Sequence, residues 1–476
     1  MDRRTLAANF VRSIPRPESL SEHAVILLSV TLLFISCVDI GFAGNMGKML
    51  WLISLAIVSY MNIGAGFGIY VASVAIYNAK HVWGEQSIFD RLDSFGLILI
   101  LLTFAFSRLR RDSLFRARYL LLTISFYILF TLLHTQARGL LNWFTFAEFL
   151  RMFGLPFTIF LVLRIASPSL REIRSFSAVI LILGAYMAIV SILERLGMYS
   201  IIIPPWIGNP NLNGTIGSGR SGGPLLQAEF NGFALGLIYC IILGMTSIER
   251  SRYVLLKFAI CLLCVIGIFF TYTRAAWAAV ALASLFLLFR PSSVLGGNTI
   301  KRFVFFSIML LLAGFLILFP SREARERTGD TGTIYYRINL WAAGLSMASH
   351  KPFLGYGIGQ FESKASDYQV STNLAPEMVI PEEGSGTHNV FLNVLIEQGI
   401  FGLVLYLLIM AQIFLSARGK TARSNGSPVS GPWIVAFTLV YFVNAQFVNI
   451  HEPVTNLIYF GAMGMIAGLT ATDQLT

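Results

Sequence analysis

Apolar stretches close to membrane-spanning length recur along almost the whole chain, and this repetition constrains the fold more than any other feature. Of the 476 residues, 56% are hydrophobic and only 12% charged, and the mean hydropathy is +0.71. These values exclude an ordinary soluble domain. A spanning helix needs about 20 apolar residues, so the apolar content is sufficient for about 12–14 spans. The sequence therefore predicts an all-α fold, a polytopic membrane helix bundle.

The positions of the apolar stretches give the predicted spans. They lie near residues 24–43, 49–62, 65–79, 93–107, 118–134, 143–163, 175–194, 226–247, 253–271, 275–289, 302–319, 389–415, 431–449 and 454–470. The stretch 49–79 is divided near Asn62, because a single helix would place the N-terminal arginines on the opposite side from every later basic loop. With this division, both termini are predicted to be cytoplasmic.

The basic residues behind the net charge of +11 are clustered in short loops. The clusters lie at 108–118, 164–174, 250–257, 290–302 and 418–423. Such clustering is typical of cytoplasmic loops under the positive-inside rule, so it indicates topology rather than a nucleic-acid partner. The partner that the composition predicts is the lipid bilayer, with no nucleic acid.

One long polar segment, residues 320–388, interrupts the spans and is predicted to face the side opposite the basic loops. It carries six basic and eight acidic residues, so it lacks their basic bias. Within it, residues 333–349 are predicted to form an amphipathic helix, whose apolar stripe should lie on the membrane or on the bundle. The stripe consists of Ile334, Ile338, Trp341 and Leu345. We predict a single membrane domain, residues 1–476, with one large external loop bearing short amphipathic helices.

Three arginines on the predicted outer side are candidates for binding an anion. Arg274 lies where two apolar helices meet, and an arginine within the bilayer costs at least about 2.5–3.5 kcal/mol, so it needs a partner or an anionic ligand. Arg337 borders the apolar stripe and can point inward. Arg220 lies in the glycine-rich stretch 217–224, whose amides can form an anion-binding nest before a helix start. Taken singly, each has a simpler explanation: snorkelling, an exposed ion pair and a flexible turn, respectively.

A histidine at the start of a predicted span is the candidate for proton transfer. An imidazole titrates near neutrality, so His388 suits a general base acting on a hydroxyl, and the alternative is an interfacial residue at a helix start. Asn389 and Asn393, four residues apart, give the helix that follows a polar stripe, which Glu397 is predicted to extend. Thr273 adds a hydroxyl beside Arg274. The predicted catalytic residues are His388, Arg337 and Arg274. The predicted substrate-binding residues are Arg220, Thr273, Asn389 and Glu397.

Several outward arginines and one histidine together predict a site for a phosphorylated lipid and a hydroxyl acceptor. Arginine binds diphosphate in a bidentate manner and stays charged, and fixed positive charge favours a leaving diphosphate. No outer-loop cluster has clean metal-ligand spacing, with Asp90–Asp93 as the one weak match, and Cys261 and Cys264 are interpreted as buried apolar residues. We predict no metal and no cofactor. The GYGIG segment at 355–359 is interpreted as a turn.

The order of these segments resembles the O-antigen ligase and Wzy-type polysaccharide polymerase superfamily of bacterial envelopes. The resemblance covers residues 210–410, which we predict to be the catalytic core. It rests on RSGGP…EFNG at 220–232, FTYTRAAW at 270–277, Arg337…Trp341, PFLGYGIG at 352–359 and HNVFL…EQGIFG at 388–402. The sequence departs from the family at Thr273, where a serine commonly precedes the arginine.

The resemblance implies transfer of an oligo- or polysaccharide from undecaprenyl diphosphate to a hydroxyl of a glycan or lipid acceptor, by an inverting displacement without a metal. It implies that Arg220, Arg274 and Arg337 hold the diphosphate and that His388 positions or deprotonates the acceptor. It also implies a multi-pass protein of the bacterial inner (cytoplasmic) membrane with a periplasmic active site, so that residues 320–388 form a periplasmic loop.

Three alternatives stay open at this point. A ligase transfers finished polymer to lipid A–core, whereas a polymerase extends a growing chain, and we favour the polymerase because the Gly-Pro…Glu-Phe-Asn-Gly segment resembles exopolysaccharide polymerases. A polytopic transporter of a lipid-linked or anionic substrate would have pseudo-symmetric halves, and the sequence has no such repeat. A metal-dependent lipid-linked glycosyltransferase would need an acidic motif in its first outer loop, and residues 44–48 contain none.

Overall fold

A computed structural model of the protein describes eleven stretches of the chain. They are residues 44–77, 111–209, 211, 213–215, 219–248, 253–291, 298–318, 332–368, 386–422, 431–448 and 453–469. The predicted spans 24–43 and 93–107 lie outside the described residues, as do Asp90–Asp93 and parts of the long loop 320–388.

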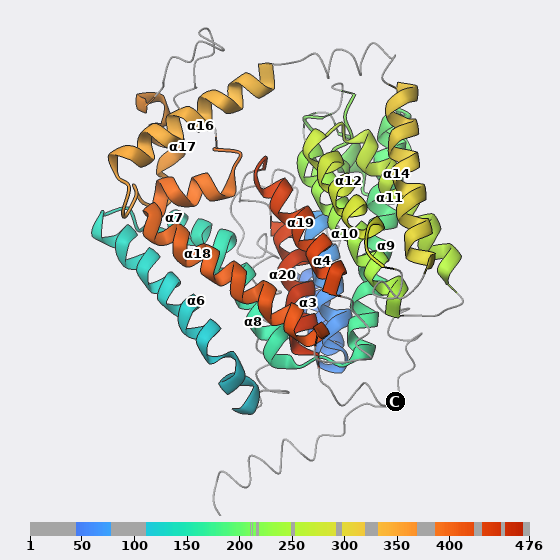
Figure 1. Cartoon of the computed structure of the whole chain (residues 1–476), viewed down its shortest axis with the longest axis horizontal. Coiled ribbons are helices and arrows are strands. Elements are labelled where there is room, and N and C mark those ends of the chain that lie inside the picture. Colours follow the sequence, from blue (N-terminus) through green and yellow to red (C-terminus); the bar gives the residue numbers. More distant parts are fainter. Residues whose placement is uncertain are drawn as a thin grey trace, which may run out of the picture.

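The described residues form helices and connecting loops without a strand, which confirms the predicted all-α membrane bundle (Figure 1). The α-helices are α3 (Gly44–Met61), α4 (Ile63–Tyr77), α6 (Arg111–Ala137), α7 (Trp143–Phe149), α8 (Leu155–Ala166), α9 (Leu170–Arg195), α10 (Ala228–Ile248), α11 (Val254–Phe270), α12 (Arg274–Leu288), α14 (Asn298–Leu318), α16 (Gly332–His350), α17 (Gln360–Lys364), α18 (Val390–Ala422), α19 (Gly431–Ala445) and α20 (Pro453–Gly468). Each predicted span within the described residues corresponds to one helix, or to the continuous helical run from α7 to α8.

Four helical segments of the described residues are long and apolar enough to cross a bilayer. They are Ala117–Ala137, Thr145–Ala166, Leu170–Arg195 and Val390–Gly419. Shorter apolar helices accompany them, among them α10, α11 and α12. The polytopic character is thus confirmed, whereas the number of about 12–14 spans and the cytoplasmic location of both termini stay predictions.

The centre of the bundle is α20, whose residues are all buried. A helix that is apolar on every side belongs inside a protein. Glycines allow its close packing: a Cβ on Gly464 would lie 2.8 Å from the Phe160 carbonyl oxygen of α8, and a Cβ on Gly461 would lie 2.1 Å from the Phe67 ring of α4. Small residues therefore set how closely α20 approaches its neighbours, as they commonly do in membrane bundles.

The predicted division of residues 49–79 is present as a break between α3 and α4 at Asn62. Asn62 caps α4, because its Oδ1 accepts a hydrogen bond from the Ala65 N–H at 2.9 Å. A Cβ on Gly66 would lie 2.6 Å from the Cα of Ser59, so the two helices pack against each other and do not form one straight helix. The two-helix interpretation of this stretch is therefore confirmed.

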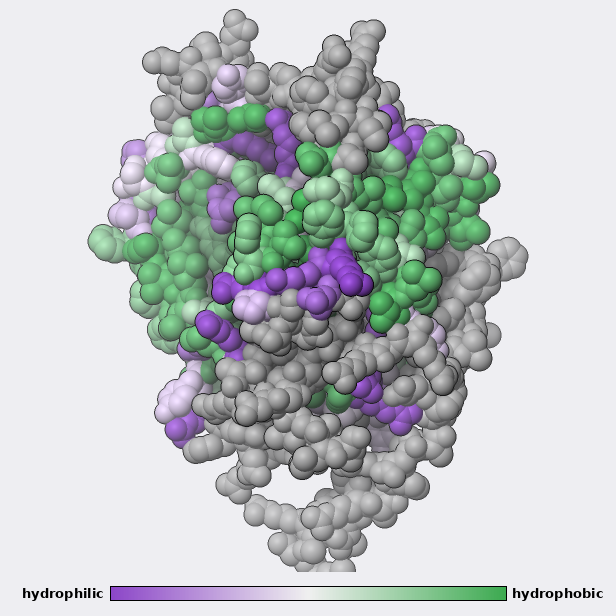
Figure 2. Space-filling model, turned by 45° about the vertical axis from the view of Figure 1, so that its right-hand side comes forward, coloured by the Kyte–Doolittle hydropathy of each residue, from purple (hydrophilic) through white to green (hydrophobic). Residues whose placement is uncertain are grey.

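Large apolar side chains are exposed along α6, which lies at the edge of the bundle in Figure 1. They include Tyr119, Leu122, Phe126, Leu129 and Leu133. Figure 2 shows a broad hydrophobic band on one face of the molecule. Continuous apolar surface of this extent is unfavourable in water and is well solvated by lipid tails. The surface therefore agrees with a bilayer as the partner.

The long loop carries α16 and α17 at one end of the bundle, and both pack against α18 (Figure 1). α16 confirms the helix predicted at 333–349. Its most deeply buried apolar residues are Leu340, Ala343 and Met347, which pack in one cluster with residues of α18. Ile334 and Leu345 of the predicted stripe are exposed, at 42% and 58%. The predicted stripe as a whole is therefore not the face that packs on the bundle, and contact with the membrane stays a prediction for it.

Candidate functional site

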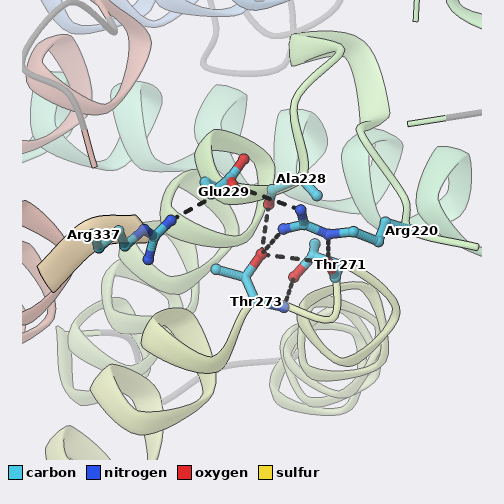
Figure 3. Close-up of polar contacts among 6 residues, drawn as sticks. All are labelled: Arg220, Ala228, Glu229, Thr271, Thr273 and Arg337. Atoms are coloured by element: carbon cyan, nitrogen blue, oxygen red, sulfur yellow. Dashed lines mark hydrogen bonds and ion pairs between the residues drawn. The ribbon is translucent and has the colours of Figure 1, made fainter. Parts of the chain in front are cut away.

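Three segments that are distant in the sequence meet at one site (Figure 3). They are the glycine-rich loop before α10, the turn between α11 and α12, and the first half of α16. Their charged side chains form a group that we call the arginine cluster: Arg220, Glu229, Arg274 and Arg337. Three of these four residues were singled out by the sequence as candidate site residues.

Arg220 is held by the turn between α11 and α12. Its Nε donates a hydrogen bond to the Thr271 carbonyl oxygen at 3.1 Å, and its Nη2 donates to Thr273 Oγ1 at 3.2 Å. Thr273 Oγ1 in turn donates to the Ala228 carbonyl oxygen of α10 at 3.1 Å. The structure therefore brings the two predicted substrate-binding residues Arg220 and Thr273 together, and the threonine positions the arginine.

The described part of the glycine-rich loop is anchored on the C-terminal side of Arg220. Gly223 has a φ of +57°, in the left-handed region that favours glycine, and its N–H donates to the buried Glu194 Oε2 at 2.9 Å. The Ser221 N–H donates to the Phe270 carbonyl oxygen, the last residue of α11, at 3.0 Å. These two hydrogen bonds tie the loop to α9 and α11 and give it a defined shape. The structure therefore favours a positioned Arg220 over an arginine in a flexible turn.

Three residues in or next to the segments that form the arginine cluster have left-handed backbone conformations that side chains disfavour. One is Leu226, between Arg220 and Glu229 in the sequence, with a φ of +58°. Tyr272, within the turn between α11 and α12, has a φ of +49°, and His388, just before α18, has a φ of +48°. Such conformations cost about 1–3 kcal/mol each and persist only where surrounding contacts impose them. Strained backbone conformations of this kind are common at functional sites. Their occurrence beside the arginine cluster therefore supports this region as the functional site.

Glu229 is a member of the site for which the sequence alone predicts no role. It lies in the first turn of α10, where its Oε1 is 3.6 Å from Nη1 of Arg220 and 3.8 Å from Nη2 of Arg337. Figure 3 shows the carboxylate between the two guanidinium groups. The sequence does contain a clue to this role. An acidic residue at the start of a span needs a partner, and the three candidate arginines are possible partners for Glu229.

Arg274 and His388 lie within electrostatic reach of this bridge. Burial lowers the pKa of Arg337, Glu229 opposes the shift, and the charges of Arg220 and Arg274 add to it. Burial also lowers the pKa of His388 from its ordinary value of 6.5, Arg337 lowers it further, and Glu229 raises it. The His388 imidazole is therefore neutral at pH 7, the form that can accept a proton.

The other two predicted substrate-binding residues make contacts elsewhere. Asn389 caps α18, since its Oδ1 accepts from the Leu392 N–H at 3.0 Å, and its Nδ2 donates to Gln446 Oε1 at 3.1 Å. Glu397 is only 2% exposed and accepts from Asn393 Nδ2 at 3.2 Å and from two backbone N–H groups at the start of α17. Glu397 thus belongs to a buried network, and its predicted contact with substrate gains no support from its surroundings.

The segment between α16 and α17, Lys351–Gly359, packs on a break in α18 at Gly399, and we call it the docked loop. Backbone hydrogen bonds join the two: Tyr356 N–H to Ile396 O at 2.9 Å, Gly357 N–H to Glu397 O at 2.8 Å, and Ile400 N–H to Pro352 O at 2.7 Å. A Cβ on Gly399 would lie 2.2 Å from the Phe353 carbonyl oxygen. The GYGIG segment is indeed a turn, and the glycines allow backbone to touch backbone.

The described residues include no group of three or more His, Cys, Asp or Glu side chains placed to hold a metal ion. Cys261 and Cys264 are buried and not in a disulfide, as expected of apolar residues in a helix. Whether the protein works without a metal stays a prediction, which an assay with a chelator can test.

The arginine cluster and His388 have a clear chemical capacity. Guanidinium groups at a half-buried position favour phosphate or carboxylate ligands, and a neutral imidazole beside them can take a proton from a hydroxyl. Fold and site together define a polytopic membrane protein with several arginines and one histidine gathered at one site.

A family model described as O-antigen ligase matches residues 259–407. Over this segment the match confirms the predicted resemblance to the O-antigen ligase and polymerase superfamily. It includes Arg274, Arg337 and His388, whereas Arg220 and Glu229 precede it. The match indicates a membrane enzyme that transfers glycans. No curated protein matches the chain.

Proposed function

We propose that this protein transfers an oligo- or polysaccharide from undecaprenyl diphosphate to an acceptor hydroxyl at the periplasmic face of the bacterial inner membrane, without a metal. The proposal rests chiefly on the convergence of Arg220 and Arg337 on one position, with Arg274 and a neutral His388 in electrostatic reach. Three guanidinium groups suit the charge and the several oxygen atoms of a lipid diphosphate. The O-antigen ligase match gives the class of reaction.

The reaction is an inverting displacement at the anomeric carbon of the donor glycan. The acceptor hydroxyl oxygen forms a bond to this carbon while the bond from the carbon to the diphosphate oxygen breaks. The hydroxyl proton passes to His388, and the electron pair of the broken bond leaves with undecaprenyl diphosphate. The products are the glycan joined to its acceptor and the free lipid diphosphate, so no further reactant is needed.

The residues of the site have separate roles in this displacement. The arginines stabilise the leaving diphosphate, where negative charge develops, and one such donor typically contributes about 10²–10³ in rate. Thr273 fixes Arg220 through the hydrogen bond at 3.2 Å, so the guanidinium needs little rearrangement when the donor binds. His388 acts as the base because burial and Arg337 lower its pKa and keep it neutral at pH 7.

Polymerase and ligase differ in the acceptor rather than in the donor. We favour a polymerase, which extends a growing chain of repeat units, because the Gly-Pro…Glu-Phe-Asn-Gly segment resembles exopolysaccharide polymerases. A ligase that transfers finished polymer to lipid A–core is the second candidate. The runner-up outside the enzyme class is a polytopic transporter of a lipid-linked or anionic substrate, for which arginines at a membrane surface would also be suitable.

The experiment uses purified full-length protein with undecaprenyl-diphosphate-linked repeat units, in EDTA and without divalent metal. Products are sized on a gel, with and without added lipid A–core, for wild type and His388→Ala. A ladder without added acceptor supports the polymerase, and product only with lipid A–core supports the ligase. Loss of the positioned base should lower the rate about 10²–10⁴-fold in His388→Ala.

Two results would contradict the proposal. Absence of product in both reactions, with and without lipid A–core, although the substrate is active, would favour the transporter. Activity that requires added Mg²⁺ or Mn²⁺ would contradict the metal-independent mechanism while leaving glycan transfer in place.

A further inference from the structure

Glu229 has no part in the displacement as described, in which the arginines face the donor diphosphate. Its carboxylate is nevertheless at the centre of the arginine cluster, in contact with Arg220 from the glycine-rich loop and with Arg337 from α16. A negative side chain among groups that should bind a negative ligand opposes that binding unless it moves. Its position therefore requires a physical explanation.

One oxygen atom makes both contacts. Glu229 Oε1 lies 3.6 Å from Arg220 Nη1 and 3.8 Å from Arg337 Nη2. A direct charge-assisted hydrogen bond between nitrogen and oxygen is shorter, about 2.7–2.9 Å. The carboxylate is therefore attracted by both guanidinium groups without a close hydrogen bond at either of these two contacts, and a better-fitting anion can compete with it.

The place between the arginines is also accessible. The side chains of Arg220, Arg337 and Glu229 are 19%, 26% and 28% exposed. Arg220 is held from its other side by the Thr271 carbonyl oxygen and by Thr273, so it need not move when Glu229 leaves. Glu229 lies in the first turn of α10, where the helix dipole favours negative charge, whether it belongs to a side chain or to a ligand.

We propose that Glu229 is a counter-ion that the diphosphate of the donor replaces, an inference that rests on the proposed function. In the free protein, Oε1 occupies the position of a phosphate oxygen and keeps two like-charged guanidinium groups together. When the donor binds, its phosphate oxygens take over both ion pairs and the Glu229 side chain turns away. Glu229 is thus a positioning residue that forms the site before the substrate arrives.

The same exchange runs in reverse after the glycan has been transferred. The Glu229 carboxylate competes with the product diphosphate for Arg220 and Arg337, and this competition weakens the hold on the product. Removing the carboxylate should therefore strengthen the binding of donor and product and slow product release. Turnover and KM for the lipid donor should both decrease, whereas a merely damaged site would show a raised KM.

Glu229→Gln tests the inference, because glutamine keeps the shape and removes the charge. The measurement is isothermal titration calorimetry of purified full-length protein with inorganic pyrophosphate as the probe. Loss of the competing carboxylate should lower the Kd about tenfold or more relative to wild type. Glu362→Gln is the matched control, since it removes a carboxylate from α17, in the long loop that also carries α16, and it should bind pyrophosphate as wild type does.

A second variant keeps the test decisive if Glu229→Gln does not fold. Glu229→Asp retains the charge and draws it back by one methylene group, so its Kd should lie between those of wild type and Glu229→Gln. Thermal unfolding in detergent shows which variants are folded. A Glu229→Asp protein that binds pyrophosphate more weakly than wild type would overturn the counter-ion role.

The outcomes separate this inference from the proposed function. Arg220→Gln should bind pyrophosphate more weakly than wild type, since it removes a guanidinium from the site. If it does, and Glu229→Gln binds no more tightly than wild type, the counter-ion role is overturned and the diphosphate site stands. If no protein binds pyrophosphate, or Arg220→Gln binds it unchanged, the diphosphate site itself is overturned, and the inference with it.

Discussion

The arginine cluster and the docked loop both consist of segments that carry the family resemblance. They are held together by different interactions: ion pairs in the first and backbone hydrogen bonds in the second. In the arginine cluster, partly exposed charged side chains from the glycine-rich loop, α10 and α16 converge at distances of 3.6 and 3.8 Å. In the docked loop, backbone groups pair with the backbone of α18 at 2.7–3.3 Å, and glycines replace side chains at the closest contacts. The first arrangement can exchange its partners for a ligand, and the second cannot do so without losing its fold.

This difference shows that residues which carry the same family resemblance need not share one role. Glu397 and Arg337 were both predicted as site residues, and only Arg337 lies in the arginine cluster. Glu397 accepts hydrogen bonds beneath the docked loop, so it holds α17 against α18. The docked loop therefore acts on the chemistry indirectly, by fixing the long loop that carries α16.

The largest effect should come from disturbing the contact of the docked loop with α18. Gly399→Ala places a methyl group 2.2 Å from the Phe353 carbonyl oxygen, at a φ of +67° that disfavours a side chain. The combined strain should cost at least about 2–3 kcal/mol and lower both the Tm and the yield of folded protein. Size-exclusion chromatography and thermal unfolding in detergent measure this.

Gly419→Ala is the matched control, because a Cβ there, in the same helix, would meet no atom within 4 Å. It should leave the Tm unchanged or raise it slightly. A Gly399→Ala protein as stable as Gly419→Ala would show that the docked loop is not a structural contact.

A smaller effect is expected from Glu397→Ala, which removes the acceptor of two backbone N–H groups and of Asn393. Leaving a buried donor unsatisfied costs about 1–3 kcal/mol, so the Tm should decrease by several degrees while KM for the lipid donor stays constant. Measuring KM at a temperature where the variant is fully folded separates an effect on substrate binding from the loss of stability. A raised KM with an unchanged Tm would restore the substrate-binding role predicted from the sequence.

The smallest effect is a displacement of the pH profile. His388 must be neutral to accept a proton, and burial together with Arg337 lowers its pKa from 6.5, so the acidic limb of kcat/KM should lie below pH 6.5. Glu229 opposes this shift, so Glu229→Gln should move the limb to still lower pH. An acidic limb above pH 6.5 in wild type, or a limb that moves upward in Glu229→Gln, would contradict the assignment of His388.

Much of the fold could be predicted because a bilayer demands long apolar helices and the sequence shows them directly. The break at Asn62 followed from the charges of the loops, and α16 followed from its periodicity. The buried face of α16 could not be predicted, since both Leu340 and Leu345 are apolar and only the packing on α18 distinguishes them.

The site could be predicted only in part, for a related reason. Arginines and a histidine next to spans are conspicuous, so Arg220, Arg274, Arg337 and His388 could be selected from the sequence. The role of Glu229 depends on where α10 and α16 lie relative to each other, which local sequence does not determine.

The most direct test of the central claim compares Arg274→Lys and Arg337→Lys with wild type in the transfer assay. Lysine keeps the charge and loses the bidentate fork, so each variant should lose about 10²-fold in activity at an unchanged level of membrane insertion. Arg290→Lys, at an exposed residue just beyond the opposite end of α12, is the control and should stay close to wild type. Near-normal activity of both Arg274→Lys and Arg337→Lys would contradict the assignment of these arginines to the donor diphosphate.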